Sequence, residues 1–266
     1  MKNRQECLSS FSMTRRRFYA PLSAFDSSLT RITLASDEAR HLREVLRLKV
    51  GDEVYVFNGA GKEFQCRVEE TRRDAAHLMV VREVDAARPE SPLHLTLAVA
   101  LLKGEKFDLV VQKATELGVS VIVPVVTRLA DIRLRHESDV LKRMARWQRI
   151  ALEAAKQSGR SVVPDISTPV AFATLILEAV AEPQSNCLMF SERDGESLTE
   201  TKKLLTAKAT RLTALVGSEG GWIDEELATA REAGWRIITL GGRTLRAETA
   251  AIAAAVLLQH FAGDLV

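Results

Sequence analysis

The sequence has few cysteines, and they lie far apart. Cys7, Cys66 and Cys187 form neither a disulfide framework nor a metal cluster, and histidine and cysteine never gather at the spacing of metal ligands. We therefore expect free thiols in a reducing cytoplasm and no metal site.

Long apolar runs are also missing. No run reaches the roughly 18 residues that a membrane-spanning helix needs, although 46% of the 266 residues are hydrophobic. The N-terminus lacks the apolar segment of a secretory signal. These absences predict a protein with a full hydrophobic core and no membrane partner. Composition predicts a disordered extension at residues 1–13, with Met13 as a candidate start.

An excess of one charge is absent overall but present locally. The net charge is only +2, yet residues 15–49 hold eight basic residues against four acidic ones, and residues 131–160 repeat this excess. Two basic segments in a near-neutral chain suggest contact with a polyanion. Charge alone leaves a solvated charged face open as the alternative.

The first part of the sequence reads as a small β-rich domain. Four short segments rich in β-branched or aromatic residues predict strands: 31–34, 53–58, 63–70 and 76–83. Asn58 and Gly59 begin the clearest hairpin turn. A helix is expected at 37–48, because its apolar residues recur at helical spacing. Together these elements predict a short barrel with a helix at its mouth.

Residues 87–92 contain two prolines and predict a linker, after which strands and helices alternate. The expected strands are 93–101, 119–126, 187–191, 212–216 and 236–240. The expected helices are 107–117, 138–157, 170–180, 198–208, 224–233 and 247–261. Alternation of this kind is typical of an α/β domain with a parallel sheet.

Two glycine-rich loops, 217–222 and 241–246, each follow a predicted strand and precede a predicted helix. Ligands of open α/β sheets bind beyond the carboxyl ends of strands. Neither loop has the spacing of a dinucleotide or triphosphate loop, which disfavours those ligands. Bare amides and carbonyls suit an adenine edge and an amino-acid tail instead. The last expected helix is apolar almost all round, which indicates burial in a core or a dimer interface.

These two loops carry the sequences GSEGGWIDEEL and LGGRTLRAETA, which resemble the signature of the SPOUT methyltransferases. The resemblance extends from Arg15 onward to the ribosomal RNA small-subunit methyltransferase E family. The motifs that carry it are RRRFYAP, HLREVLRLKVGDEVYVFNGAGKEF, KGEKFDLVVQKATELGV and RMARWQRIALEAAKQSGR. The sequence departs from the family at Ser218 and Gly242, where proline is usual and would stiffen the loops.

The resemblance implies an α/β fold with a trefoil-knotted SPOUT methyltransferase domain at residues 93–266. A PUA-like RNA-binding β-barrel at residues 14–86 would precede it. It further implies S-adenosyl-L-methionine as cofactor and methylation of N3 of a uridine in 16S rRNA of the 30S subunit. The family forms homodimers through the knot domain, and the target base is expected to be flipped out of its stack.

The resemblance also assigns site residues. It places the cofactor, mostly through backbone, against Leu215, Gly217, Gly220, Leu240, Gly241, Leu245 and Arg246. Arg246 is the first candidate for stabilising charge on the base, Glu219 for the cofactor's amino group or the proton, and Arg17 for reaching the RNA. A structural ion pair of Arg246 with Glu219 or Glu248, helix capping by Glu219 and a solvated Arg17 are the alternatives.

The candidate RNA contacts are Arg15, Arg16, Arg17, Arg43, Arg47, Lys103, Arg149 and Arg160. Three other functions compete: a SPOUT enzyme with another RNA target, a catalytically inactive RNA-binding relative, and a small-molecule α/β enzyme. The intact loop glycines argue against the inactive relative. The basic segments and the added barrel argue against the small-molecule enzyme.

Overall fold

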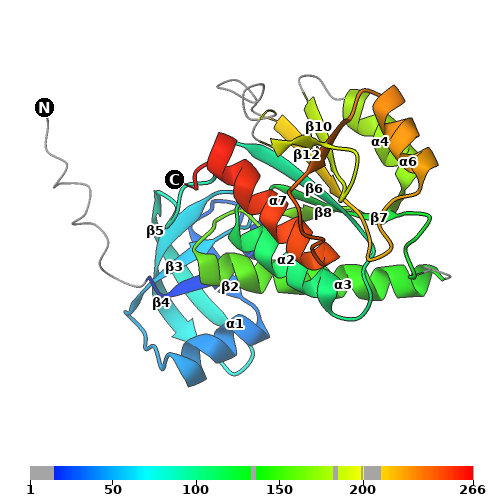
Figure 1. The fold of residues 1–266 in the computed structure, drawn as a ribbon. Coiled ribbons are helices and arrows are strands. Elements are labelled where there is room, and N and C mark those ends of the chain that lie inside the picture. The colour runs from blue at the N-terminus through cyan, green and yellow to red at the C-terminus, as the bar shows by residue number, and fades with distance from the viewer. Residues whose placement is uncertain (1–14, 133–135, 182–184, 199, 201–210, 266) are drawn as a thin grey trace, which may run out of the picture. The chain divides into compact units, whose positions relative to one another are not determined.

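A computed structural model of the chain describes residues 15–132, 136–181, 185–198, 200 and 211–265 (Figure 1). The chain divides into two compact units, residues 1–89 and 90–266. The extension expected at residues 1–13 lies outside the described residues, as does nearly all of the helix expected at 198–208.

The small unit is built on a five-stranded sheet with the order β1-β3-β4-β5-β2. Its elements are β1 (Arg17–Tyr19), η1 (Leu22–Ala24), β2 (Arg31–Leu34), α1 (Ser36–Arg40), η2 (His41–Val45), β3 (Glu53–Phe57), β4 (Glu63–Thr71) and β5 (Ala76–Val84). All four predicted strands are present. The sequence reading missed β1, a three-residue strand that pairs parallel to β3 and is too short to show a pattern. Closure of this sheet into a barrel stays a prediction.

The predicted hairpin joins β3 to β4, which pair antiparallel. The side-chain oxygen of Asn58 accepts hydrogen bonds from the backbone N–H of Ala60 (2.8 Å) and Lys62 (3.1 Å). Asparagine is favoured in turns because its side chain can satisfy the turn's own amides in this way.

The helix expected at 37–48 is shorter than predicted. It consists of α1 and one turn of π-helix, η2, and ends at Val45. Leu42 is fully buried, but Val45 and Leu46 are 65% and 37% exposed, so the expected apolar stripe is only partly correct. Arg47 then takes a left-handed conformation with φ 53°, which turns the chain back toward the core.

The large unit is a parallel sheet with helices on both faces, as predicted. Its strands are β6 (His94–Ala100), β7 (Val121–Val126), β8 (Asp165–Ile166), β9 (Val170–Ala171), β10 (Ser185–Phe190), β11 (Glu196–Ser197), β12 (Arg211–Val216) and β13 (Arg236–Thr239). Its helices are α2 (Lys106–Glu116), α3 (Glu137–Ser158), α4 (Phe172–Ala181), α6 (Asp224–Glu232) and α7 (Ala247–Ala262). The strand order is β11-β13-β10-β12-β6-β7-β8, with β9 paired to β7. The two-residue strands β8, β9 and β11 escaped prediction because two residues carry no periodicity.

Alternate side chains of the strands build two cores. In β12, Leu212, Ala214 and Val216 face the core that α2, α3 and α7 cover, whereas Leu215 faces the core beneath α4 and α6. Figure 1 shows α7 lying beside α2 on the first face. Since consecutive residues of a strand point to opposite faces, this arrangement explains why the strands read as nearly continuous apolar runs.

Cys66 and Cys187 are free thiols, as predicted, and both are buried. Burial raises the pKa of Cys66 to about 12. Among the described residues, no helix is long and apolar enough to cross a membrane. Within the same residues, no three His, Cys, Asp or Glu side chains gather closely enough to hold a metal ion.

Candidate functional site

A cavity of about 380 Å³ opens at the carboxyl ends of β10, β12 and β13, beside the start of α7. Its walls are the loop after β10, the glycine-rich loop after β12 and the glycine-rich loop before α7. The lining residues are Phe190, Ser191, Glu192, Val216, Gly217, Ser218, Glu219, Gly220, Gly221, Trp222, Thr239, Leu240, Gly241, Arg243, Thr244, Leu245, Arg246, Ala247 and Ala250. Both glycine-rich loops expected from the sequence therefore meet at one site.

The β12–α6 loop packs around a buried tryptophan. Trp222 is 4% exposed and donates a hydrogen bond from Nε1 to the carbonyl oxygen of Phe190 at 2.8 Å. A Cβ on Gly217 would lie 3.0 Å from the Trp222 ring, so glycine is needed here for the close approach. The ring joins the loop after β12 to the end of β10 and forms part of the cavity wall.

The same loop is held by the segment that follows β7. The Ser218 hydroxyl donates to the carbonyl oxygen of Leu129 at 3.1 Å, and a Cβ on Gly220 would lie 2.9 Å from the Cβ of Leu129. The backbone N–H of Arg128 donates to Glu226 at 2.9 Å. Ser218 thus has a hydrogen bond that a proline at this position could not make.

The β13–α7 loop presents bare backbone to the cavity. Gly241 has φ 122°, a conformation that favours glycine, and added Cβ atoms at Gly241 and Gly242 would meet nothing within 4 Å. Arg246 occupies the N-cap position of α7. The first turn of this helix offers backbone N–H groups, which favour negative charge nearby.

An ion pair connects the β12–α6 loop to the start of α2. Lys106 Nζ lies 2.8 Å from Glu219 Oε1. Partial burial raises the pKa of Glu219, but hydrogen bonds from Lys106 and from backbone N–H groups outweigh it, so the pKa lies below its usual value. A lowered pKa makes this carboxylate a weak proton acceptor.

A second lysine of the β6–α2 connection pairs with the segment after β7. Lys103 Nζ lies 2.5 Å from Asp131 Oδ2, and this hydrogen bond raises the pKa of Lys103. Both side chains are more than half exposed, so the pair contributes little to stability.

Arg246 lines the cavity and is exposed, so its guanidinium is accessible. No carboxylate of the described residues lies within 4.0 Å of it, because Glu219 pairs with Lys106, and Glu248 is 9% exposed and does not line the cavity. The alternative of a structural ion pair for Arg246 is therefore not realised. Arg243, also exposed, brings a second positive charge to the same wall.

The structure brings most of the expected cofactor residues together. The members that line the cavity are Gly217, Gly220, Leu240, Gly241, Leu245 and Arg246. Leu215 does not line it, since its side chain is fully buried in the core under α4 and α6. Glu219, proposed for catalysis, stands in the wall beside them.

The sequence reading missed the loop after β10, which supplies Ser191 and Glu192 to the cavity. A Cβ on Gly221 would lie 3.0 Å from Glu192 Oε1, so this carboxylate lies against the glycine-rich loop. Arg193 holds the two loops together by donating to the carbonyl oxygen of Trp222 at 3.1 Å and pairing with Asp224 at 2.7 Å. The loop after β10 lies at the carboxyl end of a predicted parallel strand, and this position was the signal that could have identified it from the sequence.

The candidate RNA contacts of the large unit differ in accessibility. Arg149 is exposed on α3, whereas Arg160 is only 6% exposed. Arg160 pairs with Glu90 at 2.7 Å and donates to the carbonyl oxygens of Thr115 (2.8 Å) and Val119 (3.0 Å). Its guanidinium is used inside the unit, which is a correction to its expected contact with phosphate.

In the small unit, Arg15 and Arg17 both bind Glu63, whose side chain is fully buried. Arg17 also stacks over Phe57, 4.6 Å from the ring centroid, and its side chain is 8% exposed. Burial raises the pKa of Glu63, but Arg17 and the other donors outweigh it, and the pKa lies below its usual value. The solvated Arg17 considered above is wrong, because the guanidinium is part of a buried network.

The other candidates of the small unit lie at its surface. Arg16 and Arg47 are exposed. Arg43 is half-buried and donates from Nη1 to the carbonyl oxygens of Arg72 (2.7 Å) and Arg73 (2.9 Å). Arg43 therefore fixes the β4–β5 turn against the end of η2.

Two sequence profiles match the chain: one described as an RNA methyltransferase domain over residues 89–259, and one described as an RNA methyltransferase PUA domain over residues 34–80. The ribosomal RNA small subunit methyltransferase E of Synechocystis is 31% identical over 91% of this chain and 76% of its own length. The matches thus cover both units.

Solved structures agree with the sequence comparisons. The ribosomal RNA small subunit methyltransferase E of Neisseria gonorrhoeae, bound to S-adenosyl methionine, has a TM-score of 0.81 and 32% identity, over 95% of this chain and all of its own. A putative methyltransferase of Legionella pneumophila, in complex with the cofactor SAM, has a TM-score of 0.83 and 29% identity over the same shares.

Proposed function

This chain belongs to the ribosomal RNA small subunit methyltransferase E family, and we propose that it transfers a methyl group from S-adenosylmethionine to N3 of a uridine in 16S rRNA. The fold is an α/β methyltransferase fold with a PUA-like domain. The observation that carries the proposal is the meeting of the two glycine-rich loops at one cavity beside α7.

The cavity fits the cofactor. Its volume of about 380 Å³ lies within the range of small-molecule sites, roughly 300–1,000 Å³. Cβ atoms added at Gly241 and Gly242 would have free space, so these glycines leave room that side chains would fill. We assign the cofactor site to Gly217, Gly220, Leu240, Gly241, Leu245 and Arg246. Bound there, S-adenosylmethionine supplies an already activated methyl group.

We assign Arg246 the central catalytic role. N3 of uridine must lose its proton, which we assign to solvent at the open side of the cavity. A guanidinium that pairs with no carboxylate of the described residues would stabilise the negative charge that develops on the base. Glu219 stays ionised beside Lys106. Its proposed role is therefore to fix the β12–α6 loop and to keep a negative charge at the cavity, rather than to accept the proton. Arg17 is assigned to the Glu63 network instead of catalysis.

The fold proposal is finer than the α/β assignment. We propose that the segments carrying both glycine-rich loops thread a trefoil knot in a SPOUT domain at residues 93–266, with residues 87–92 as linker and residues 14–86 as a PUA-like RNA-binding barrel. The parallel order β13-β10-β12-β6 supports this, because both cofactor loops then leave the same edge of the sheet.

We further propose a homodimer through the knot domain, acting in the cytoplasm on rRNA within the 30S subunit. The outer face of α7 supports the dimer: Ile252 and Ala253 are only half-buried and Val256 is 37% exposed, although the helix is rich in apolar residues. An apolar stripe on an exposed face suits a partner copy.

The test of the proposed function is nucleoside mass spectrometry of 16S rRNA from cells that lack the gene. We expect 3-methyluridine to be missing and to return when the gene is restored. A gene with codon 246 changed to alanine should not restore it, although the protein accumulates normally. Persistence of 3-methyluridine without the gene would reject uridine N3 as the target and leave the methyltransferase family assignment in place.

A further inference from the structure

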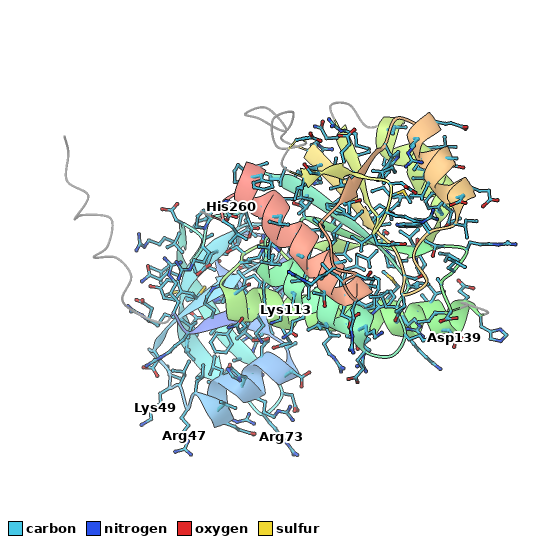
Figure 2. All side chains as sticks on the ribbon, viewed as in Figure 1. Arg47, Lys49, Arg73, Lys113, Asp139 and His260 are labelled. Atoms are coloured by element: carbon cyan, nitrogen blue, oxygen red, sulfur yellow. The ribbon has the colours of Figure 1, made fainter. Side chains whose placement is uncertain are left out.

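One end of the small unit combines exposed apolar and exposed basic side chains. Val45 and Val50 are each 65% exposed and Leu46 is 37% exposed. Arg47, Lys49 and Arg73 are exposed as well. Figure 2 labels these three basic residues at the same end of the small unit. We refer to the six residues Val45, Leu46, Arg47, Lys49, Val50 and Arg73 as the basic tip.

Two chain segments are joined to make the basic tip. Arg43 donates hydrogen bonds to the carbonyl oxygens of Arg72 and Arg73, which ties the β4–β5 turn to the end of η2. The Lys49 N–H donates to Asp52 at 2.8 Å, and the Gly51 N–H donates to the Val68 carbonyl oxygen at 2.8 Å. The basic side chains are thus carried by an ordered backbone.

The three basic side chains form no ion pair with another described residue of the chain. Among the described residues, no carboxylate lies within 4.0 Å of the charged groups of Arg47, Lys49 or Arg73, whereas the neighbouring Arg72 pairs with Glu70 at 2.7 Å. Unpaired cations on a fixed surface attract a polyanion.

Arg47 occupies a backbone position that suits glycine. Its φ is 53°, the left-handed conformation in which glycine commonly closes a helix end, and the Leu48 N–H that follows bonds to the Leu42 carbonyl oxygen at 3.0 Å. A side chain in this conformation costs stability. Strained residues of this kind gather where function needs the side chain.

We propose that the basic tip is an RNA docking surface on which the three cations contact phosphates and the apolar side chains lie against ribose and base edges. The wide, shallow minor groove of an RNA helix presents sugars and phosphates together, which matches this mixture. The inference rests on the proposed function for the choice of RNA as the polyanion. Arg43, expected to contact phosphate, instead organises the surface.

The test compares Arg47→Gly with Leu29→Gly. Leu29 is the matched control: it is another exposed residue of the small unit with a left-handed φ, 54°, but it has no charge. Binding to 16S rRNA transcribed in vitro is measured over a series of KCl concentrations. Both variants should melt no lower than the wild type, since glycine relieves the backbone strain. Only Arg47→Gly should bind RNA more weakly, and its log–log salt slope should fall by about one.

Two further variants separate the parts of the basic tip. The triple variant R47G/K49A/R73A should lower the salt slope by about three. The variant V45S/V50S should weaken binding at every salt concentration without changing the slope. Wild-type affinity and slope in R47G and in the triple variant, or equal weakening in L29G, would overturn the proposal.

Failure of the proposed function would look different. In that case the wild type would leave the RNA unmethylated in the presence of S-adenosylmethionine, while the salt slopes would still decide whether the basic tip binds RNA. Affinity for S-adenosylmethionine should be equal in all these variants, because the substituted residues lie in the small unit and outside the cavity wall.

Discussion

Lys106 Nζ lies 2.8 Å from Glu219 Oε1, and this ion pair joins the start of α2 to the β12–α6 loop that lines the cavity. Partial burial by itself would raise the pKa of Glu219. The hydrogen bond from Lys106 is the strongest of the effects that lower it. The pair therefore keeps a negative charge fixed at the cavity above that lowered pKa.

Removal of the lysine charge should change the pH dependence of methyl transfer. In the wild type Glu219 has a lowered pKa, so the ion pair is intact above that pKa and is lost only as the pH falls through it. In Lys106→Met the pKa of Glu219 should rise, and the acid limb of the rate profile should move to higher pH. Lys106→Arg keeps the charge and should keep the wild-type limb. An unchanged profile in Lys106→Met would show that the pair has no part in the reaction.

Gly217 and Gly242 should respond differently to alanine. A Cβ at Gly217 would lie 3.0 Å from Trp222, so Gly217→Ala should displace the ring and destabilise the protein by about 1–3 kcal/mol. Calorimetry and tryptophan fluorescence would detect both effects. Gly242→Ala meets nothing within 4 Å and should melt as the wild type does. Equal melting of the two variants would contradict the close packing of Trp222 against Gly217.

The hydroxyl of Ser218 should matter for cofactor affinity. Ser218→Ala removes the hydrogen bond to Leu129 and should cost about 1 kcal/mol of stability, because Ser218 is buried. Calorimetric titration with S-adenosylmethionine should give a several-fold weaker Kd, with little change in the maximal rate. Ser218→Pro, the residue usual in the family, also loses the hydrogen bond but stiffens the loop, and should bind more tightly than the alanine variant. A Kd of Ser218→Ala equal to that of the wild type would show that the contact does not order the cofactor loop.

Glu63 should carry much of the stability of the small unit. Glu63→Gln leaves the guanidinium of Arg17 largely buried beside a neutral group, and should destabilise the unit by about 3 kcal/mol. Because the folded pKa of Glu63 is lowered, its contribution is present above the unfolded pKa and is lost as the pH falls through the folded value. The difference in melting temperature between wild type and variant should thus shrink in acid, as thermal unfolding at several pH values can test. A difference that stays constant down to low pH would contradict this assignment.

The sequence predicted the elements that have a clear periodicity. All five long strands of the large unit were found, as was α7, whose Ala251, Ala254 and Ala255 are fully buried on the face toward β6 and β12. Strands of two or three residues, such as β8 and β1, were missed because their pairing depends on neighbours distant in the sequence. The helix after residue 36 was overestimated because Val45 and Leu46 match a helical stripe but face solvent.

The sequence predicted those parts of the candidate site that the backbone forms. Glycines after two parallel strands mark a ligand loop, and both loops do line the cavity. Individual side chains were harder. Partners such as Lys106 for Glu219 and Glu63 for Arg17 are 113 and 46 residues away in sequence. Only the folded chain brings them together, and it separates Leu215 from the cavity because alternate residues of β12 face opposite cores.

The central claim is that the cavity holds the methyl donor for transfer to a uridine of 16S rRNA. The most direct measurement incubates the purified protein with unmodified 30S subunits and S-adenosylmethionine that carries a deuterated methyl group, followed by mass spectrometry of the nucleosides. We predict deuterated 3-methyluridine with the wild type and at least about a hundredfold slower appearance with Arg246→Ala. Label on another nucleoside, or an equal rate with Arg246→Ala, would contradict the account.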